Sequence, residues 1–208
     1  MNIEFKTEND KISYALGMNI GESLVQVPAE LNPELLAQAI KDLLAGKQPA
    51  LKEEDYVAVM KAFQAKMQAA EQEAAKGASV ENAAEEKAFM EENKSAPGVV
   101  TTASGLQYIV LKEGAGKKPG AEDTVKVHYA GALLDGTEFD SSIKRGQPAE
   151  FGVGQVIKGW TEALQLMSVG SKFRVFVPSA LAYGERGAGQ VIGPCSMLIF
   201  DVELIDIL

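Results

Sequence analysis

The stretch between Lys52 and Asn93 constrains the fold most, because it predicts one helix too long for a compact domain. Residues 67–97 read MQAAEQEAAKGASVENAAEEKAFMEENKSAP and consist mainly of strong helix formers with little apolar surface to bury. Such a composition is typical of a solvated helix or of a disordered linker. We favour a helix that is stopped by Pro97-Gly98, with Gly77 as the place for any bend. At 1.5 Å per residue it would be roughly 60 Å long, a spacer arm.

The composition changes at the end of this stretch. Residues 1–100 hold 10 Lys, no Arg and 17 acidic residues, a net charge of −7, whereas residues 101–208 carry −2 of the total −9. Only 5 of the 20 glycines lie in the first hundred residues. The first half is therefore expected to be helical and the second rich in turns, which indicates two domains.

Helical periodicity fills the residues before the long stretch. Asp10 is a candidate cap for a helix whose apolar residues Ile12, Leu16, Ile20 and Leu24 recur every fourth position. A second helix is expected to start at Asn32-Pro33, a cap followed by proline at the first helical position. It carries a broad apolar stripe and ends at Gly46.

These apolar stripes predict self-association through residues 1–70. A domain of this size is marginal by itself, and short helices with wide stripes need another surface to cover them. A second copy of the chain is the simplest cover, because two-fold dimers are the commonest oligomers. The alternative is a monomer with a compact three-helix domain.

The second half alternates as β-strands do. Val125, Val127 and Tyr129 share the apolar face of one expected strand, and further strands are expected at 106–111, 137–140, 173–177 and 198–204. Asp135-Gly136 is a hairpin turn signal. A short amphipathic helix is expected at 161–167. This pattern predicts an α+β domain in which an antiparallel sheet wraps one helix.

The only tryptophan, Trp160, follows the apolar pair Val156-Ile157 and opens that short helix. Several aromatic side chains of the same half are candidate walls around it: Tyr129, Phe139, Phe151, Tyr183 and Phe200. An aromatic cup with a few polar groups is the usual make-up of a small-ligand pocket. The alternative is that these aromatic residues form only the core of a small β domain.

Several kinds of chemistry are not supported by the sequence. His128 is the only histidine and is expected to face solvent beside Lys126, and nothing positions a base for the single Cys195. Metal-ligand spacing and a phosphate-binding loop are not apparent. The acidic net charge of −9 argues against nucleic acid as a partner.

The expected compartment is the cytoplasm. No apolar run approaches the ~20 residues of a membrane span. The polar segment MNIEFKTENDKISYALG does not read as a signal peptide. The periplasm is the alternative if the sequence is a trimmed form.

Four motifs together resemble the FKBP-type peptidyl-prolyl cis-trans isomerases. They are VHYAGALLDGTEFDSS (127–142), GQVIKGWTEALQLMSVGS (154–171), PSALAYGERGAG (178–189) and LIFDVELI (198–205). DKISYALG and PGVVTTASGLQY are similar to the Mip-like (macrophage infectivity potentiator) branch. That resemblance implies an N-terminal all-α dimerisation domain (1–70), an arm of long helix (71–98) and an isomerase domain (99–208). It also implies a V-shaped homodimer with chaperone activity.

The resemblance further implies roles for individual residues. The catalytic positions of the family would be Tyr129, Phe139, Asp140, Val156, Ile157, Trp160, Tyr183 and Phe200. Substrate-binding positions would be Phe151, Arg145, Val191 and Ile192. No cofactor or metal is implied, and the implied partners are unfolded or proline-containing proteins and macrolides such as FK506 or rapamycin. The sequence differs from human-type members at Ala149, Gln155, Ala188 and Gly193, and a non-catalytic peptide-binding or holdase module is the alternative function.

Overall fold

The computed structural model describes residues 3–25, 27 and 29–208. The chain divides into two compact units, Met1–Glu73 and Ala74–Leu208. Within the described residues, no helix is both long and apolar enough to cross a membrane.

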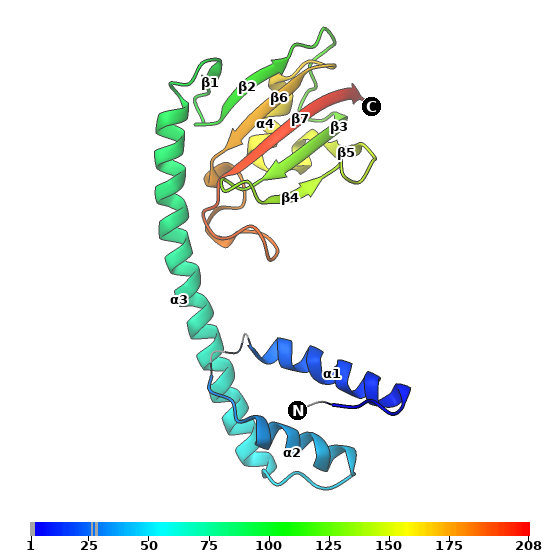
Figure 1. Cartoon of the computed structure of the whole chain (residues 1–208). Helices are drawn as coiled ribbons and strands as arrows, with labels where there is room; N and C mark the ends of the chain where they lie inside the picture. The colour runs from blue at the N-terminus through cyan, green and yellow to red at the C-terminus, as the bar shows by residue number, and fades with distance from the viewer. Residues whose placement is uncertain (1–2, 26, 28) are drawn as a thin grey trace. The chain divides into compact units, whose positions relative to one another are not determined.

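The first unit contains helices α1 (Glu8–Val25) and α2 (Pro33–Leu44) and the first part of α3 (Glu53–Asn93) (Figure 1). The expected cap of α2 is confirmed, since the Asn32 side chain accepts from the backbone N–H groups of Glu34 and Leu35 at 3.0 and 3.2 Å. The expected cap of α1 is wrong by one turn. Thr7 accepts from the Asp10 N–H, and Asp10 accepts in return from the Thr7 N–H, which is a capping box.

The helices of the first unit form no core of their own. None of the residues in α1, α2 or α3 is buried. Leu16 and Leu35, for example, are 58% and 68% exposed although they lie on the apolar stripes. These helices therefore lack the buried core that the monomeric alternative, a three-helix domain, would have.

Helix α3 is continuous over its 41 residues and passes through Gly77 without a break. It ends at Asn93, four residues before Pro97, which cannot continue a helix. The helical interpretation of this charged stretch is confirmed, and the disordered linker is not found.

The second unit contains an antiparallel sheet of seven strands, in the order β1-β2-β6-β7-β3-β4, with β5 also paired to β3. The strands are β1 (Val99–Thr101), β2 (Gln107–Lys112), β3 (Thr124–Ala132), β4 (Glu138–Ser141), β5 (Ala149–Gly152), β6 (Lys172–Val177) and β7 (Leu198–Ile207). Helix α4 (Lys158–Leu166) lies on one face of this curved sheet (Figure 1). Strands β1 and β5 were not predicted, because three or four residues are too few to show an alternating pattern and, unlike β4, neither follows a hairpin turn signal such as Asp135-Gly136.

The core lies between α4 and the sheet. Strand β3 turns Val125, Val127 and Tyr129 inward, as its alternation predicts, and α4 buries Trp160 and Leu164 against them. The two longest strands, β3 and β7, pair with Tyr129 opposite Val202. The face of the sheet that covers α4 is therefore also the face that supplies the aromatic residues.

Helix α4 approaches strand β6 so closely that only glycine fits at position 159. A Cβ atom on Gly159 would lie 2.4 Å from Cγ1 of Val177, a residue with no exposed surface. Because α4 lies this close to β6, the neighbouring Trp160 is buried in the domain. Gly77 in α3 has no such neighbour within 4 Å.

We expect Gly159→Ala to destabilise the second unit by about 1–3 kcal/mol, since an added methyl group overpacks a rigid core. Urea unfolding followed by the fluorescence of Trp160, the only tryptophan, measures this. The matched control is Gly77→Ala, which should leave stability unchanged or raise it by up to about 1 kcal/mol, because alanine favours a helix over glycine. Equal losses in both variants would contradict the packing argument.

Candidate active site

A pocket of about 450 Å³ opens on the second unit. Its walls come from strands β3, β4, β5 and β7, from the first turn of α4 and from the segment between β6 and β7. The residues that line it are Tyr129, Phe139, Asp140, Phe151, Gln155, Val156, Ile157, Trp160, Tyr183 and Phe200.

Trp160 lies at the centre of the aromatic residues. Its indole ring is 5.1 Å from Tyr129, 5.6 Å from Phe151 and 5.2 Å from Phe200 between centroids, with interplanar angles of 90°, 85° and 83°. Perpendicular pairs of this kind are favoured by the quadrupoles of the rings. Three such contacts fix the orientation of the indole, which is only 5% exposed.

The opposite wall depends on a glycine in strand β3. Phe139 and Phe200 meet edge to face, 5.6 Å apart at an angle of 86°. Both rings lie over Gly131, where a Cβ atom would come within 2.7 Å of each of them. The absent side chain thus leaves the space that these two rings fill.

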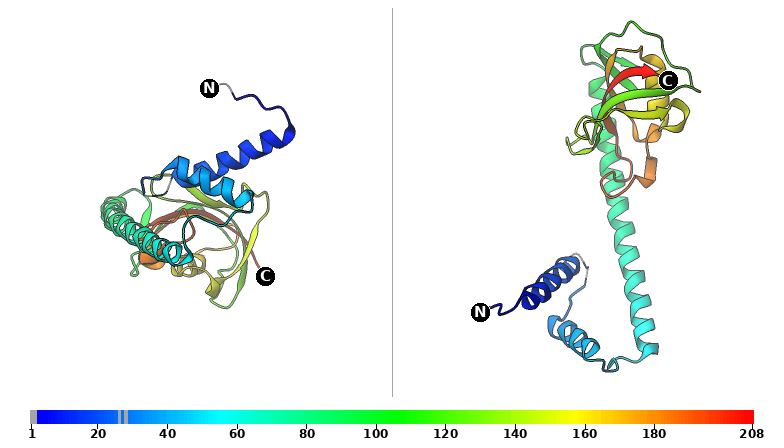
Figure 2. Two further views of the ribbon diagram at one scale, coloured as in Figure 1. Left: turned by 90° about the horizontal axis from the view of Figure 1, so that it is seen from below. Right: turned by 90° about the vertical axis from the view of Figure 1, so that its right-hand side faces the viewer.

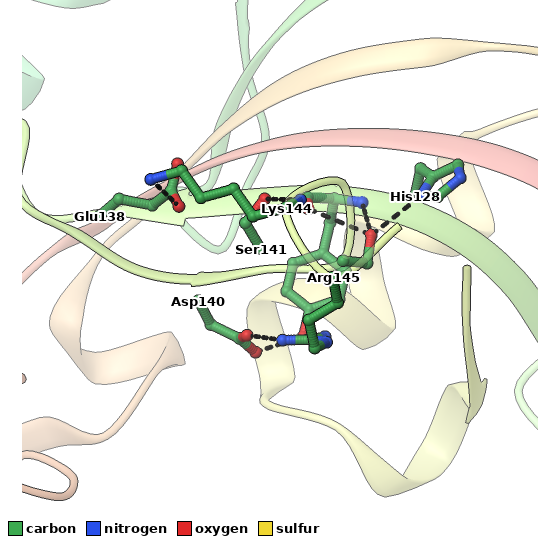
Figure 3. A network of polar contacts seen from close by, with 8 residues as sticks. His128, Glu138, Asp140, Ser141, Lys144 and Arg145 are labelled. Carbon is green, nitrogen blue, oxygen red and sulfur yellow. Dashed lines mark hydrogen bonds and ion pairs between the residues drawn. The ribbon is translucent and has the colours of Figure 1, made fainter. Parts of the chain in front are cut away.

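A polar cluster contributes Asp140 to the lining of the pocket, and Figure 3 shows the Asp140 and Arg145 side chains pointing toward one another. Asp140 accepts hydrogen bonds from the Tyr129 hydroxyl and from Nη1 of Arg145. Nη2 of Arg145 also donates to the Tyr129 oxygen at 3.0 Å, and the guanidinium lies 5.6 Å from the centre of the Tyr129 ring. Each member of the cluster therefore contacts the other two.

This cluster keeps Asp140 ionised. Partial burial raises the pKa of the Asp140 carboxyl, but the hydrogen bonds from Tyr129 and Arg145 lower it by more, so that the pKa lies below its ordinary value. Burial, and next the hydrogen bond to Asp140, raise the pKa of the Tyr129 hydroxyl above its ordinary value. At neutral pH the pocket therefore contains a carboxylate and a protonated phenol.

Most of the residues singled out from the sequence lie around this one pocket. All eight positions expected to be catalytic line it, and so does Phe151. Arg145 does not line the pocket but donates a hydrogen bond to Asp140, which does. Val191 is about half exposed and Ile192 is buried in the core, and neither lines the pocket.

Gln155 lines the pocket but was singled out only as a difference from the family pattern. It ends the short 3-10 helix η1 (Val153–Gln155), directly before Val156. The sequence signal that could have identified Gln155 as a pocket residue is its position directly before Val156 and Ile157, which also line the pocket. A polar residue at a pocket rim has no periodicity of its own.

The two residues examined for nucleophilic chemistry lie elsewhere. His128 lies on the face of β3 opposite Val127 and Tyr129, as the alternation predicts, and is partly buried there, with its Nδ1 atom 3.1 Å from the Ser142 hydroxyl (Figure 3). Cys195 does not line the pocket, and its sulfur lies 3.1 Å from the Ser79 hydroxyl.

We expect Tyr129→Phe to raise the pKa of Asp140 toward the ordinary value of about 3.9, because a donor to the carboxylate is lost. A folded-state pKa below the unfolded one adds stability that is complete above the unfolded pKa and is lost as the pH falls through the folded pKa. The variant should therefore lose less stability on acidification. The carboxyl chemical shift of Asp140, followed against pH by NMR, measures the pKa directly. Tyr108→Phe, outside the pocket, is the control, and identical titrations in all three proteins would contradict the assignment.

The comparisons with known proteins agree with this arrangement. Residues 115–205 match the family model of the FKBP-type peptidyl-prolyl cis-trans isomerase, and residues 9–110 match the model of the domain amino terminal to it. The chain is 44% identical to the FKBP-type 22 kDa peptidyl-prolyl cis-trans isomerase of Escherichia coli, over 98% of both chains. It is 46% identical to the outer membrane protein MIP of Legionella longbeachae, over 97% of this chain and 86% of that protein.

A solved structure shows the same similarity. The crystal structure of FkpA from Escherichia coli superposes with a TM-score of 0.74 at 35% identity and covers 98% of both chains. Relatives this similar along nearly the whole chain, together with two family models in sequence order, establish that the chain belongs to the FKBP-type peptidyl-prolyl cis-trans isomerase family.

Proposed function

We propose that the pocket around Trp160 binds the proline of an X-Pro bond and accelerates its cis-trans isomerisation in protein chains. The observation that carries the proposal is the aromatic cup itself, with its indole fixed by three perpendicular rings and a polar cluster at one side. A proline ring is a compact apolar group that such a cup accommodates.

The chemistry requires no covalent or metal catalyst. Twisting a peptide bond removes its resonance and meets a barrier of about 18–20 kcal/mol. The two isomers of an X-Pro bond are close in energy, so that a catalyst need only lower this barrier. The twisted amide has less charge separation than the planar one and is favoured by transfer from water to an apolar pocket. Each ~1.4 kcal/mol of such preference is a tenfold gain in rate.

The residues then take distinct roles. Trp160 is the floor on which the proline ring lies, and the rings of Tyr129, Phe139, Phe151 and Phe200 are the walls. The Ile157 N–H and the Tyr183 hydroxyl are proposed donors to substrate carbonyl groups. Val156 is a rim residue, and Val191 and Ile192 belong to a segment that covers a bound peptide. Asp140 and Arg145 fix the Tyr129 ring through their hydrogen bonds.

We expect Trp160→Ala to reduce kcat/KM for a short X-Pro peptide at least tenfold, since the floor of the pocket is lost. Tyr183→Phe should reduce it by roughly fivefold, the value of one hydrogen bond. A protease-coupled or NMR exchange assay of peptide isomerisation measures both. Tyr108→Phe, a tyrosine stacked on Phe173 outside the pocket, should keep full activity. An inactive parent protein would favour a non-catalytic binding module instead.

Macrolides such as FK506 or rapamycin are proposed ligands of the same pocket. The proposal rests on the membership in the family and on the apolar walls. Competition between a macrolide and the X-Pro peptide would place the two ligands at one site.

We further propose that residues 1–70 form a homodimer interface, that residues 71–98 are the arm and that residues 99–208 are the isomerase domain. The apolar stripes of α1 and α2 support this division, because the part of the chain that the structure describes leaves them unburied and they need a covering surface. Two isomerase domains on one dimer would bind an unfolded chain with avidity, which supports a chaperone role. A cytoplasmic location stays a prediction.

We expect the double variant Leu16→Glu/Ile20→Glu to be monomeric in sedimentation equilibrium, because it places charges in the proposed interface. Isomerisation of a short peptide per chain should be unchanged. Proline-limited refolding of a protein substrate should slow, since avidity is lost. Asn19→Glu on the same helix is the control for added charge, and a variant that remains dimeric would refute the interface.

A further inference from the structure

The segment between Ser179 and Ser196 carries Tyr183, and helix α3 holds it at both ends. This segment connects β6 to β7 and contains the two short 3-10 helices η2 (Ser179–Leu181) and η3 (Gly184–Arg186). The part of α3 that contacts it belongs to the same compact unit. Figure 2 shows this end of α3 running beside the sheet.

The first contact is at the start of the segment. The backbone N–H of Ser179 donates to Oε2 of Glu86 at 2.8 Å. Ser179 is the first residue of η2, and the first N–H groups of a helix have no partner within it. The Glu86 carboxylate of α3 therefore accepts from the Ser179 N–H, which would otherwise lack a partner in η2 and lies four residues before Tyr183.

The second contact is at the end of the segment. Nδ2 of Asn82 donates to the Pro194 carbonyl at 2.8 Å and to the Ser196 hydroxyl at 3.2 Å. Between them, the Cys195 N–H donates to the carbonyl of Gly184 at 2.8 Å. Gly184 directly follows Tyr183. The hydrogen bond from Asn82 to Pro194 and the one from Cys195 to Gly184 therefore connect α3 in two steps to the residue next to that tyrosine.

The backbone at this point is strained. Cys195 has φ = +54°, and among the described residues it is the one non-glycine residue with a positive φ. Such conformations persist only where the surrounding contacts impose them, and they cluster at functional sites. The contacts at hand are those of Asn82 on both sides of Cys195 and of Ser79 with its sulfur.

The helix residues form one face. Ser79, Asn82 and Glu86 are spaced by three and four positions, so their side chains point the same way from α3. Further along this face, the Phe89 ring lies 5.5 Å from that of Phe176, and Nδ2 of Asn93 donates to Oε1 of Gln107 at 2.8 Å. The helix is thus attached to the sheet at one end and to the Tyr183 segment at the other.

Tyr183 itself depends on this support. Its side chain is 42% exposed, and its hydroxyl makes no hydrogen bond to any residue that the structure describes. The position of that hydroxyl is therefore set by the backbone of the segment rather than by a side-chain partner.

We propose that Asn82 and Glu86 of helix α3 are positioning residues for isomerisation, which fix both ends of the 179–196 segment and thereby the Tyr183 hydroxyl at the pocket. The inference rests on the proposed function, since it assigns Tyr183 as a donor to the substrate. It makes this part of the arm helix a component of the isomerase site.

The test is a double-mutant cycle between Asn82→Asp and Tyr183→Phe in the full-length protein. Asn82→Asp keeps the size of the side chain but replaces the donor by a carboxylate that repels the Pro194 carbonyl. We expect it to lower kcat/KM for an X-Pro peptide by roughly three- to fivefold, no more than Tyr183→Phe does. In the Tyr183→Phe background the same change should have almost no further effect, because the group it positions is gone.

The matched control is Asn93→Asp, which removes an amide donor from the same face of α3 at the attachment to strand β2. It should leave kcat/KM unchanged although it weakens helix docking to a similar extent. Equal losses for Asn82→Asp in both backgrounds, or an equal loss for Asn93→Asp, would overturn the positioning role.

Further measurements distinguish a variant that fails to fold, and a failure of the proposed function, from a failure of the positioning role. Thermal unfolding followed by Trp160 fluorescence reports whether Asn82→Asp is folded. If it is not, Asn82→Ala and Glu86→Gln take its place in the cycle, because both weaken the contacts without adding charge. An unmodified protein without isomerase activity would refute the proposed function itself, and the positioning role would fall with it. An active protein without coupling between the two sites would refute only the positioning role.

Discussion

The close approach of helix α4 to strand β6 is the constraint on which the isomerase unit depends. With no side chain at Gly159, the first turn of α4 lies against Val177, and Trp160 is brought among the rings of Tyr129, Phe151 and Phe200. These rings are both the core of the domain and the wall of its pocket. Stability and binding therefore use the same packing, and a rigid cup results because perpendicular aromatic contacts allow few other arrangements.

The polar cluster extends this rigidity to the edge of the pocket. Asp140, Arg145 and Tyr129 satisfy one another, so that the carboxylate stays charged beside apolar walls. Tyr183 is different, because no side chain holds its hydroxyl and its backbone is tied instead to Asn82 and Glu86 of α3. In the proposed mechanism, the pocket combines a preorganised floor at Trp160 with a donor, Tyr183, whose position depends on helix α3.

The first unit differs from the second because it has no buried core among its helices. Its helices carry apolar stripes but bury none of their residues, since two short helices and the first part of α3 are too small a set to enclose a core. Residues such as Leu16 and Leu35 gain free energy from burial only when another surface covers them. The proposed homodimer would supply that surface.

The sequence by itself determined the elements with long patterns. The strand alternation of Val125, Val127 and Tyr129 could be predicted because a repeated period records which face is buried. The helix from 53 to 93 could be predicted because its residues are mainly strong helix formers, although it buries none of them. Resemblance in four motifs identified most of the pocket residues. Tertiary structure alone decided the rest. Strands β1 and β5 form because they pair with the longer strands β2 and β3. The contact of His128 with Ser142, and that of Asn82 with Pro194, 112 residues away, join segments that are separate in the sequence. Such contacts leave no periodic signal, because they depend on how distant segments meet.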